Sequence, residues 1–258
     1  MSKFDGAGVQ RLERMYSSPA IVEQRARTRA ALGIRLGERG LDIGCGPGFL
    51  LCEMAREVGP RGHIVALDVS ADMVEAARQR AQREDVAGRV EVRVGDATRL
   101  EVPPASLDFA VAVQVYLYVK DVERALAEAA RVLKAGGRLV VVDTDWDSCV
   151  WLTSDRERHR KILEAWVQDF KQPHLPPALP RLLAGAGLAV EHVESFPVLN
   201  LRYDPESFSG GVIDLMAATT ARQGIDSGAW AADLRSRTHD GDYFFSLNRY
   251  LFRARRPA

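Results

Sequence analysis

The run LDIGCGPGF, residues 41–49, decides the fold. A short apolar segment, residues 40–45, leads into three alternate glycines, and residues that suit a helix follow. Glycines let the backbone come close to a ligand, and the N-terminus of a helix offers free N–H groups. A plain strand-to-helix turn needs neither the leading acid nor the alternate glycines. The run therefore indicates a ligand-binding loop between a strand and a helix.

The spacing of the glycines narrows the choice of ligand. The dinucleotide-binding fingerprint is GxGxxG, and its third glycine allows the following helix to pack tightly. Gly44 and Gly46 fit this pattern, but Phe49 stands at the third position and the spacing is GxGxG instead. The loop therefore gives little support to a pyrophosphate site.

Strand-like apolar segments recur around this loop and alternate with segments of helical periodicity. Such alternation predicts a parallel sheet with helices on both faces, and stretches such as FAVAV and LVVVD fit a sheet that is covered on both sides. Ser70 and Asp121 are the expected N-caps of the two helices, and Gly136-Gly137 is expected to end the second. The expected strands are 40–45, 62–69, 89–94, 107–115 and 138–143, and the expected helices are 71–83 and 122–134.

The second half of the chain is less regular. Two expected helices, 205–222 and 227–237, stand between the last two expected strands, 188–199 and 243–254. We interpret the segment at about 205–237 as a helical lid, because it is too short for a core of its own. Further helices are expected at 155–172 and 181–186.

Composition excludes several classes of protein. Lys+Arg and Asp+Glu both number 35 among 258 residues, and this balance argues against a nucleic-acid partner. Three cysteines without a CxxC pair argue against a disulfide framework or a zinc site and favour the reducing cytoplasm. The N-terminal residues lack the pattern of a signal peptide, and no apolar run reaches the length of a membrane span.

The run LDIGCGPG closely resembles motif I of the class I, Rossmann-like S-adenosylmethionine-dependent methyltransferases of the small-molecule type. Further motifs follow in the family's order over about residues 35–145. Asp68 ends the second strand, where the family's acid binds the ribose hydroxyls, and a carboxylate suits a vicinal diol. Asp96 follows the third strand, where the family's acid binds the adenine amino group, and Gln114 ends the fourth, near the methionine amino group.

The resemblance implies S-adenosylmethionine as the cofactor. N-terminal residues of the family often close over it, so Tyr16 and Arg25 are expected there, with Arg25 pairing with the methionine carboxylate. The full set of expected cofactor residues is Tyr16, Arg25, Asp42, Gly44, Cys45, Gly46, Asp68, Val69, Met73, Asp96, Ala97 and Gln114.

The resemblance also implies the architecture: an α/β fold with a seven-stranded, mostly parallel sheet, helices on both faces, a last strand antiparallel to the fifth, and the lid as an insertion. We expect one domain over residues 1–258. Its parts are an N-terminal helical cover at 1–34, a cofactor-binding half at 35–147 and a substrate half at 148–258.

The expected acceptor site follows strands four and five, since open α/β sheets bind ligands at the carboxyl ends of strands. Methyl transfer from a sulfonium is an in-line displacement, and a base is needed only where the acceptor keeps its proton. We expect Tyr116 to orient the acceptor and Asp145 to act as the base; the other candidates to shape the site are Tyr118, Asp143, Trp146 and Asp147.

Several alternatives stay open. The five histidines form no metal-like pair, so no metal is expected, yet Asp143, Asp145 and Asp147 would share a direction in an extended strand and leave a metal-dependent enzyme as a weak alternative. The segment QVYL after strand four disfavours nucleic-acid amino methyltransferases. A small molecule accepting at O, N or C is favoured; a cofactor-binding protein without transfer and a nicotinamide-dependent reductase are the other readings. A homodimer is also left open.

Overall fold

The computed structural model describes residues 12–239 and 241–258. A single sheet of eight strands, in the order β3-β2-β1-β4-β5-β8-β6 with β7 paired to β8, forms its centre. The first five strands in this order run parallel, and β8 pairs antiparallel with β5, β6 and β7. The strands are β1 (Arg39–Ile43), β2 (His63–Asp68), β3 (Val90–Val94), β4 (Leu107–Val113), β5 (Leu133–Thr144), β6 (Val150–Trp151), β7 (Ala189–Asn200) and β8 (Phe245–Arg255).

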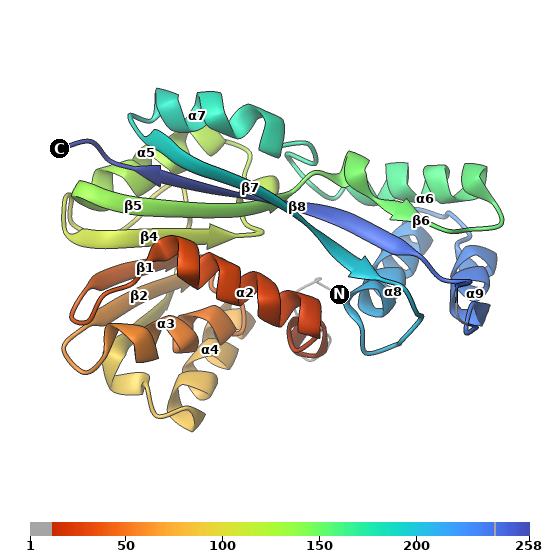
Figure 1. Cartoon of the computed structure of the whole chain (residues 1–258), viewed down its shortest axis with the longest axis horizontal. Coiled ribbons are helices and arrows are strands. Elements are labelled where there is room, and N and C mark those ends of the chain that lie inside the picture. Colours follow the sequence, from red (N-terminus) through yellow and green to blue (C-terminus); the bar gives the residue numbers. More distant parts are fainter. Residues whose placement is uncertain (1–11, 240) are drawn as a thin grey trace.

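The expected α/β architecture is confirmed, including the antiparallel last strand beside the fifth. The count differs by one because the two-residue strand β6 pairs with β8, which the sequence did not indicate. Helices cover both faces of the sheet: α2, α3 and α4 lie on one side, and α5 and α7 on the other (Figure 1). The helices are α2 (Pro19–Leu32), α3 (Phe49–Val58), α4 (Ala71–Arg83), α5 (Val122–Val132), α6 (Arg156–Val167), α7 (Leu179–Gly185), α8 (Phe208–Arg222) and α9 (Gly228–Ser236).

Side-chain caps fix the starts of the two helices foreseen in the first half. The Ser70 hydroxyl accepts from the Met73 amide at 3.4 Å, and the Asp121 carboxylate accepts from the Arg124 amide at 3.0 Å. The expected end of the second helix is wrong. Helix α5 ends at Val132, and Gly136, with φ at 74°, lies within β5. From Leu133 onward, pairing with the neighbouring strands stabilises an extended chain more than the helix propensity of these residues stabilises a helix.

The β7–β8 pair extends past the rest of the sheet, and α6, α8 and α9 gather around that extension (Figure 1). Their apolar side chains form a second hydrophobic cluster together with Met15, Met73 and Leu117 from the first half. The cluster also contains the four tryptophans of the chain: Trp146, Trp151, Trp166 and Trp230. The expected lid helices are thus packed into an interior.

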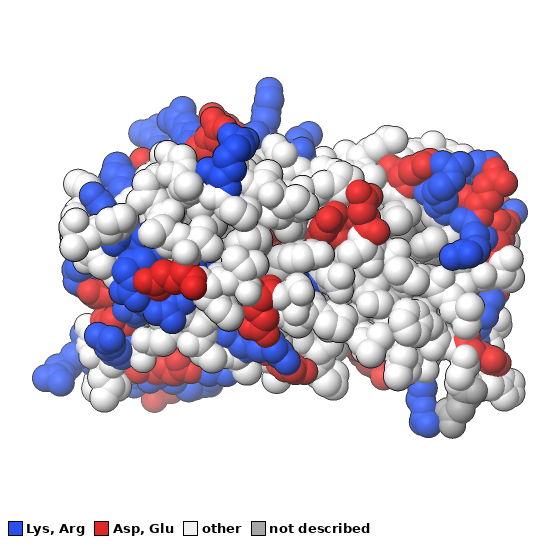
Figure 2. Space-filling view, turned by 45° about the horizontal axis from the view of Figure 1, so that its top comes forward, with Lys and Arg blue, Asp and Glu red and all other residues white. Residues whose placement is uncertain are grey.

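The surface carries both signs of charge. On the face in Figure 2, basic and acidic side chains are interspersed, in keeping with the zero formal net charge. Among the helices of the described ranges, none combines the length and the hydropathy needed to span a bilayer.

Candidate functional site

The glycine loop is held against the end of β2. The amides of Gly44 and Cys45 both donate to the Leu67 carbonyl, at 2.7 and 2.9 Å. The glycines Gly44, Gly46 and Gly48 all have positive φ, at 71°, 51° and 82°. The loop conformation therefore needs glycine at all three positions.

Packing explains two of these glycines. A Cβ on Gly44 would lie 2.4 Å from the Val115 side chain, and one on Gly48 would lie 2.9 Å from the Ala77 backbone. A side chain at position 44 would therefore clash with another side chain of the protein itself. A Cβ on Gly46 would be 3.7 Å from the Tyr16 ring, which is an ordinary contact distance. Of the three glycines, Gly46 is therefore the one at which a Cβ would not clash.

Asp68 connects this loop to the start of α4. One carboxylate oxygen accepts from the Gly46 amide and the other from the Ser70 amide, both at 3.0 Å. Burial raises the pKa of Asp68, while the amides of Ser70, Gly46 and Val69 act in the opposite direction. Each carboxylate oxygen has a second lone pair, so the group can accept from a diol as well.

One residue of β1 and one residue of the loop are buried beneath the surface of the site. Asp42 has an oxygen without a hydrogen-bond partner among the described residues, and burial, with the charge of Asp68, raises its pKa to about 7. The Cys45 thiol is buried, and burial raises its pKa well above the ordinary value, so it is an unreactive apolar group here.

The expected adenine end is more open. Asp96 is exposed after β3, and one of its oxygens accepts from the amide and hydroxyl of Thr98, at 2.7 and 2.8 Å. Val69 is exposed, whereas Met73 and Ala97 are buried. An exposed apolar Val69 next to two acids, Asp68 and Asp96, suits one side of a flat, partly polar ligand.

Gln114 turns the chain at the end of β4 with a positive φ of 58°, a strained conformation for a residue other than glycine. Its side-chain oxygen accepts from the Thr144 hydroxyl at 2.8 Å, and its own amide donates to the Val142 carbonyl at 2.7 Å. Gln114 is therefore fixed by β5.

The N-terminal residues lie close to the loop. Tyr16 lies on the side of Gly46 where a Cβ would be, and it meets the Phe49 ring edge-on, with centroids 6.3 Å apart. Arg25 donates to the Tyr16 carbonyl at 2.6 Å and to Glu53 at 2.9 Å. The guanidinium of Arg25 thus holds Tyr16 in place and is already paired with a carboxylate, which argues against a direct role in binding the cofactor.

Tyr116 and Asp143 form the polar interior at the ends of β4 and β5. Both are fully buried, and neither the Tyr116 hydroxyl nor the Asp143 carboxyl has a partner at hydrogen-bonding geometry among the described residues. Burial raises the pKa of Asp143 to about 8, opposed by the charge of Arg249 and by the amides of Tyr116 and Leu117. Burial and Asp143 both raise the pKa of Tyr116.

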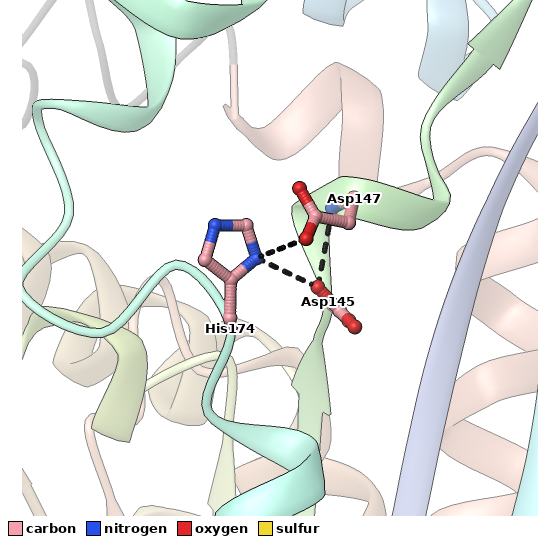
Figure 3. Close-up of side chains that lie close together, drawn as sticks. All are labelled: Asp145, Asp147 and His174. Carbon is pink, nitrogen blue, oxygen red and sulfur yellow. Dashed lines mark hydrogen bonds and ion pairs between the residues drawn. The ribbon is translucent and has the colours of Figure 1, made fainter.

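Asp145, the expected base, is occupied elsewhere. Its carboxylate accepts from the Asp147 amide at 3.1 Å, which caps the short 3-10 helix η3 (Trp146–Ser148). His174 Nδ1 lies 2.9 Å from Asp145 and 3.3 Å from Asp147 (Figure 3). The expectation that Asp143, Asp145 and Asp147 share a direction is wrong, because the strand ends at Thr144: Asp143 is buried while Asp147 is exposed.

Contacts with His174 account for the spacing of Asp145, Asp147 and His174, whose ligand atoms lie within 4.8 Å of one another. A single nitrogen, Nδ1, serves both carboxylates, as the dashed lines in Figure 3 show. We do not assign a metal to them.

Arg249 on β8 was missed by the sequence reasoning. It is 3% exposed, donates to the Thr144 hydroxyl and stands 5.0 Å from the centre of the Phe208 ring. A signal existed: Phe245, Leu247 and Leu251 are the buried positions of an alternating strand, and Arg249 is in phase with them.

A groove of about 1370 Å³ lies beside this region. It runs between the start of α2 and the end of β7, and none of the expected cofactor residues lines it. The groove reaches the glycine run at Phe49, so the site proposed from the motifs lies beside the groove rather than in it.

Residues 41–141 match the family described as a methyltransferase domain. An uncharacterised protein of transposon TN4556 from Streptomyces fradiae is 41% identical over 140 residues, which cover 54% of this chain and 40% of that protein. A demethylmenaquinone methyltransferase of Listeria welshimeri is 33% identical over 134 residues, 52% of this chain and 56% of that enzyme. The chain thus spans about half the length of the curated relatives that it matches.

Solved structures share the fold. A putative methyltransferase from Bacillus halodurans has a TM-score of 0.64 at 18% identity and covers 92% of this chain and 100% of its own. The [4+2]-cyclase SpnF also has a TM-score of 0.64, at 23% identity, covering 92% of this chain and 81% of its own. Phosphoethanolamine N-methyltransferase 2 of Haemonchus contortus, bound to S-adenosylhomocysteine, has 0.67 at 19% identity, covering 100% and 58%. With these findings beside the motifs, residues 41–141 match a methyltransferase domain, and the chain has the Rossmann-like fold of the solved methyltransferases.

Proposed function

We propose that this protein transfers the methyl group of S-adenosylmethionine to a small-molecule acceptor. The observation that carries the proposal is the enclosed polar interior at the ends of β4 and β5, where Tyr116 and Asp143 are fully buried and lack hydrogen-bond partners within the described ranges. An interior of this kind suits a small acceptor better than a nucleic-acid strand. The charges of Asp68 and Arg249 both affect the pKa of Tyr16, which lies beside the glycine loop. The glycine loop and the polar interior at the ends of β4 and β5 therefore adjoin.

The residues present fit the cofactor. Asp68 would accept from the ribose hydroxyls while holding Gly46, and Asp96 would accept from the adenine amino group. The backbone near Gln114 would bind the methionine amino group. The bound cofactor supplies a methyl group already activated by its sulfonium; the protein aligns the acceptor and excludes water.

Asp143 is a better candidate than Asp145 for the base. Its carboxyl oxygens have no side-chain hydrogen-bond partner among the residues described, and the nearby amides of Tyr116 and Leu117 leave its pKa at about 8, which suits proton transfer near neutral pH. Asp145 already serves the cap of η3 and His174. Tyr116, which lies beside Asp143, would orient the acceptor.

The acceptor class we favour is a hydroxylated aromatic ring. The support is the identity of 33% with enzymes named demethylmenaquinone methyltransferases over half of this chain. The phosphoethanolamine enzyme shares the fold alone, at 19% identity. Three free, buried cysteines fit a protein of the cytoplasm.

The test is formation of S-adenosylhomocysteine from S-adenosylmethionine with a panel of quinols, phenols, amines and carboxylates. We expect turnover with a member of the panel and its loss in Asp68→Ala. Cofactor binding without turnover across the panel would favour the alternative of a protein that binds the cofactor without transfer; SpnF, named a [4+2]-cyclase, has the same fold. Displacement of S-adenosylmethionine by NAD would favour a reductase.

A further inference from the structure

Three arginines are buried in the described part of the chain, and one of them differs from the other two. Arg25 pairs with Glu53 at 2.9 Å, and Arg138 binds both oxygens of Glu38 at 2.6 and 3.1 Å. Arg249, at 3% exposure the most buried of the three, has no carboxylate of a described residue within ion-pair distance. Its Nε also lacks a hydrogen-bond partner among those residues.

The surroundings of Arg249 do not neutralise its charge. Among the described residues, the Arg249 guanidinium contacts the Thr144 hydroxyl and the face of the Phe208 ring. Asp143 is near enough to influence its pKa but lies beyond ion-pair distance, and burial favours the neutral carboxyl of Asp143. An unpaired buried charge destabilises the fold, so a site that keeps one is suited to an anion.

A methyltransferase site could hold two anions, the methionine carboxylate of the cofactor and an anionic acceptor. The position of Arg249 indicates which of the two it would bind. The residue lies on β8 opposite Thr144, at the end of β5. The Phe208 ring that it faces belongs to α8, in the expected lid, whereas the glycine loop is held by β2 on the other side of β4 and β1. This location matches the acceptor rather than the methionine carboxylate of the cofactor.

We propose that Arg249 binds an anionic oxygen of the methyl acceptor, a carboxylate, phenolate or enolate on an apolar molecule. The proposal rests on the proposed function and adds a negative charge to what its small-molecule acceptor must carry. A guanidinium presents paired donors to such an oxygen, and charge-assisted hydrogen bonds are the stronger kind. The aromatic ring of Phe208 beside the guanidinium suits an apolar body for the ligand.

The chemistry is consistent with an anionic acceptor. An electron pair of the acceptor forms the new bond to the methyl carbon while the carbon–sulfur bond breaks, and the pair from that bond goes to sulfur. The sulfonium becomes a neutral thioether and the acceptor loses its negative charge. Arg249 keeps the acceptor deprotonated before transfer and keeps the site from repelling an anion.

The experiment compares two probes of equal shape on the full chain, with S-adenosylhomocysteine at saturation. These are 2-naphthoate, which is anionic, and 2-naphthamide, which is neutral. We expect calorimetry to give at least tenfold tighter binding of naphthoate by the unchanged protein. Arg249→Met should abolish that preference and leave the affinity for S-adenosylhomocysteine unchanged within twofold. Arg138→Met is the matched control, because it removes a buried arginine from the middle of β5, six residues before Thr144.

Three results would overturn the proposal. The first is equal or no binding of the two probes by the unchanged protein. The second is a preference that survives in folded Arg249→Met. The third is a tenfold loss of S-adenosylhomocysteine affinity in that variant, which would assign the anion to the cofactor. Arg249→Gln, with donors but no charge, replaces the variant if Met unfolds the chain. Because the probes need not react, failure here is distinct from absence of turnover.

Discussion

At the scale of single residues, Asp68 has two roles that the structure separates. Its oxygens accept from the Gly46 and Ser70 amides, which orders the loop, and it is the proposed ribose ligand. Asp68→Ala should weaken S-adenosylmethionine binding by about 1.5–3 kcal/mol, the range for hydrogen bonds to a charged group. Calorimetry measures this, with Asp72→Ala on exposed α4 surface as the control. A folded variant with unchanged affinity would refute the ribose assignment.

Asp143 gives a prediction about stability and pH. Its pKa is about 8 in the folded chain against an ordinary value of 3.8, so the folded state keeps a proton that the unfolded state loses. Stability should therefore fall as pH rises from about 4 to 8, by at most about 1.4 kcal/mol per pH unit from this group. Asp143→Asn should remove that contribution and reduce the drop in melting temperature between pH 5 and pH 8.

Asp42, with a pKa of about 7, contributes a slope of the same sign up to a lower pH, so part of the effect should persist in Asp143→Asn. The exposed Asp72→Asn is the control. If the melting temperatures of Asp143→Asn and the unchanged chain fall by the same amount over this range, Asp143 is ionised in the folded state at neutral pH. The same variant should lose turnover if Asp143 is the base.

At the scale of elements, local signals predicted most of the architecture. The caps at Ser70 and Asp121 and the run of residues 41–49 are short-range features, and each lies where it was expected. The start of β5 was misplaced because pairing with β4 and β8 depends on strands distant in sequence. The role of Asp145 as a base was predicted without knowledge of its contact with His174. That residue follows α6 in the chain, and the sequence around Asp145 does not indicate that the two side chains meet.

Arg249 shows how much of the acceptor site the sequence could have given. Its phase in β8 marks it as buried, since Leu247 and Leu251 on either side are fully buried. What the sequence cannot give is the lack of a carboxylate near it, because that depends on how β5 and α8 approach. The cofactor loop, by contrast, is contiguous in sequence.

Helix α8 is either part of a movable lid or part of a fixed core, and a mutation in it distinguishes the two interpretations. Met216 is fully buried in the cluster that holds the four tryptophans. Met216→Ala should therefore cost roughly 2–5 kcal/mol of stability, as for other large-to-small changes in a core. Urea unfolding measures this. A small loss of stability together with a change in acceptor selectivity would restore the reading of α8 as a movable cover.

Phe208 on the same helix is the matched comparison, because it faces Arg249 as well as the cluster. Phe208→Leu keeps an apolar side chain of similar reach and should change acceptor KM or selectivity, with the affinity for S-adenosylmethionine unchanged. Equal selectivity in Phe208→Leu and the unchanged protein would place the acceptor away from α8.

At the scale of the whole molecule, β8 joins the parts of the chain. Its side chains enter three hydrophobic clusters: Phe245 and Leu247 pack with the tryptophans, Leu251 packs with α3 and α4, and Phe252 packs with α5 and α7. The cofactor half and the substrate half therefore share one strand. Because neither half can lose β8 without exposing the core of the other, we expect the chain to unfold as one unit.

The four tryptophans make this measurable, because they all lie in the cluster around α6, α8 and α9 and report on that half alone. Leu251→Ala removes a fully buried side chain from the other half, at an expected cost of roughly 2–5 kcal/mol. If β8 couples the halves, tryptophan fluorescence and far-ultraviolet circular dichroism should give coincident transitions, both shifted to the same lower midpoint. Fluorescence that keeps its original midpoint while dichroism shifts would mean that the substrate half folds independently, and the single-domain interpretation would then fail.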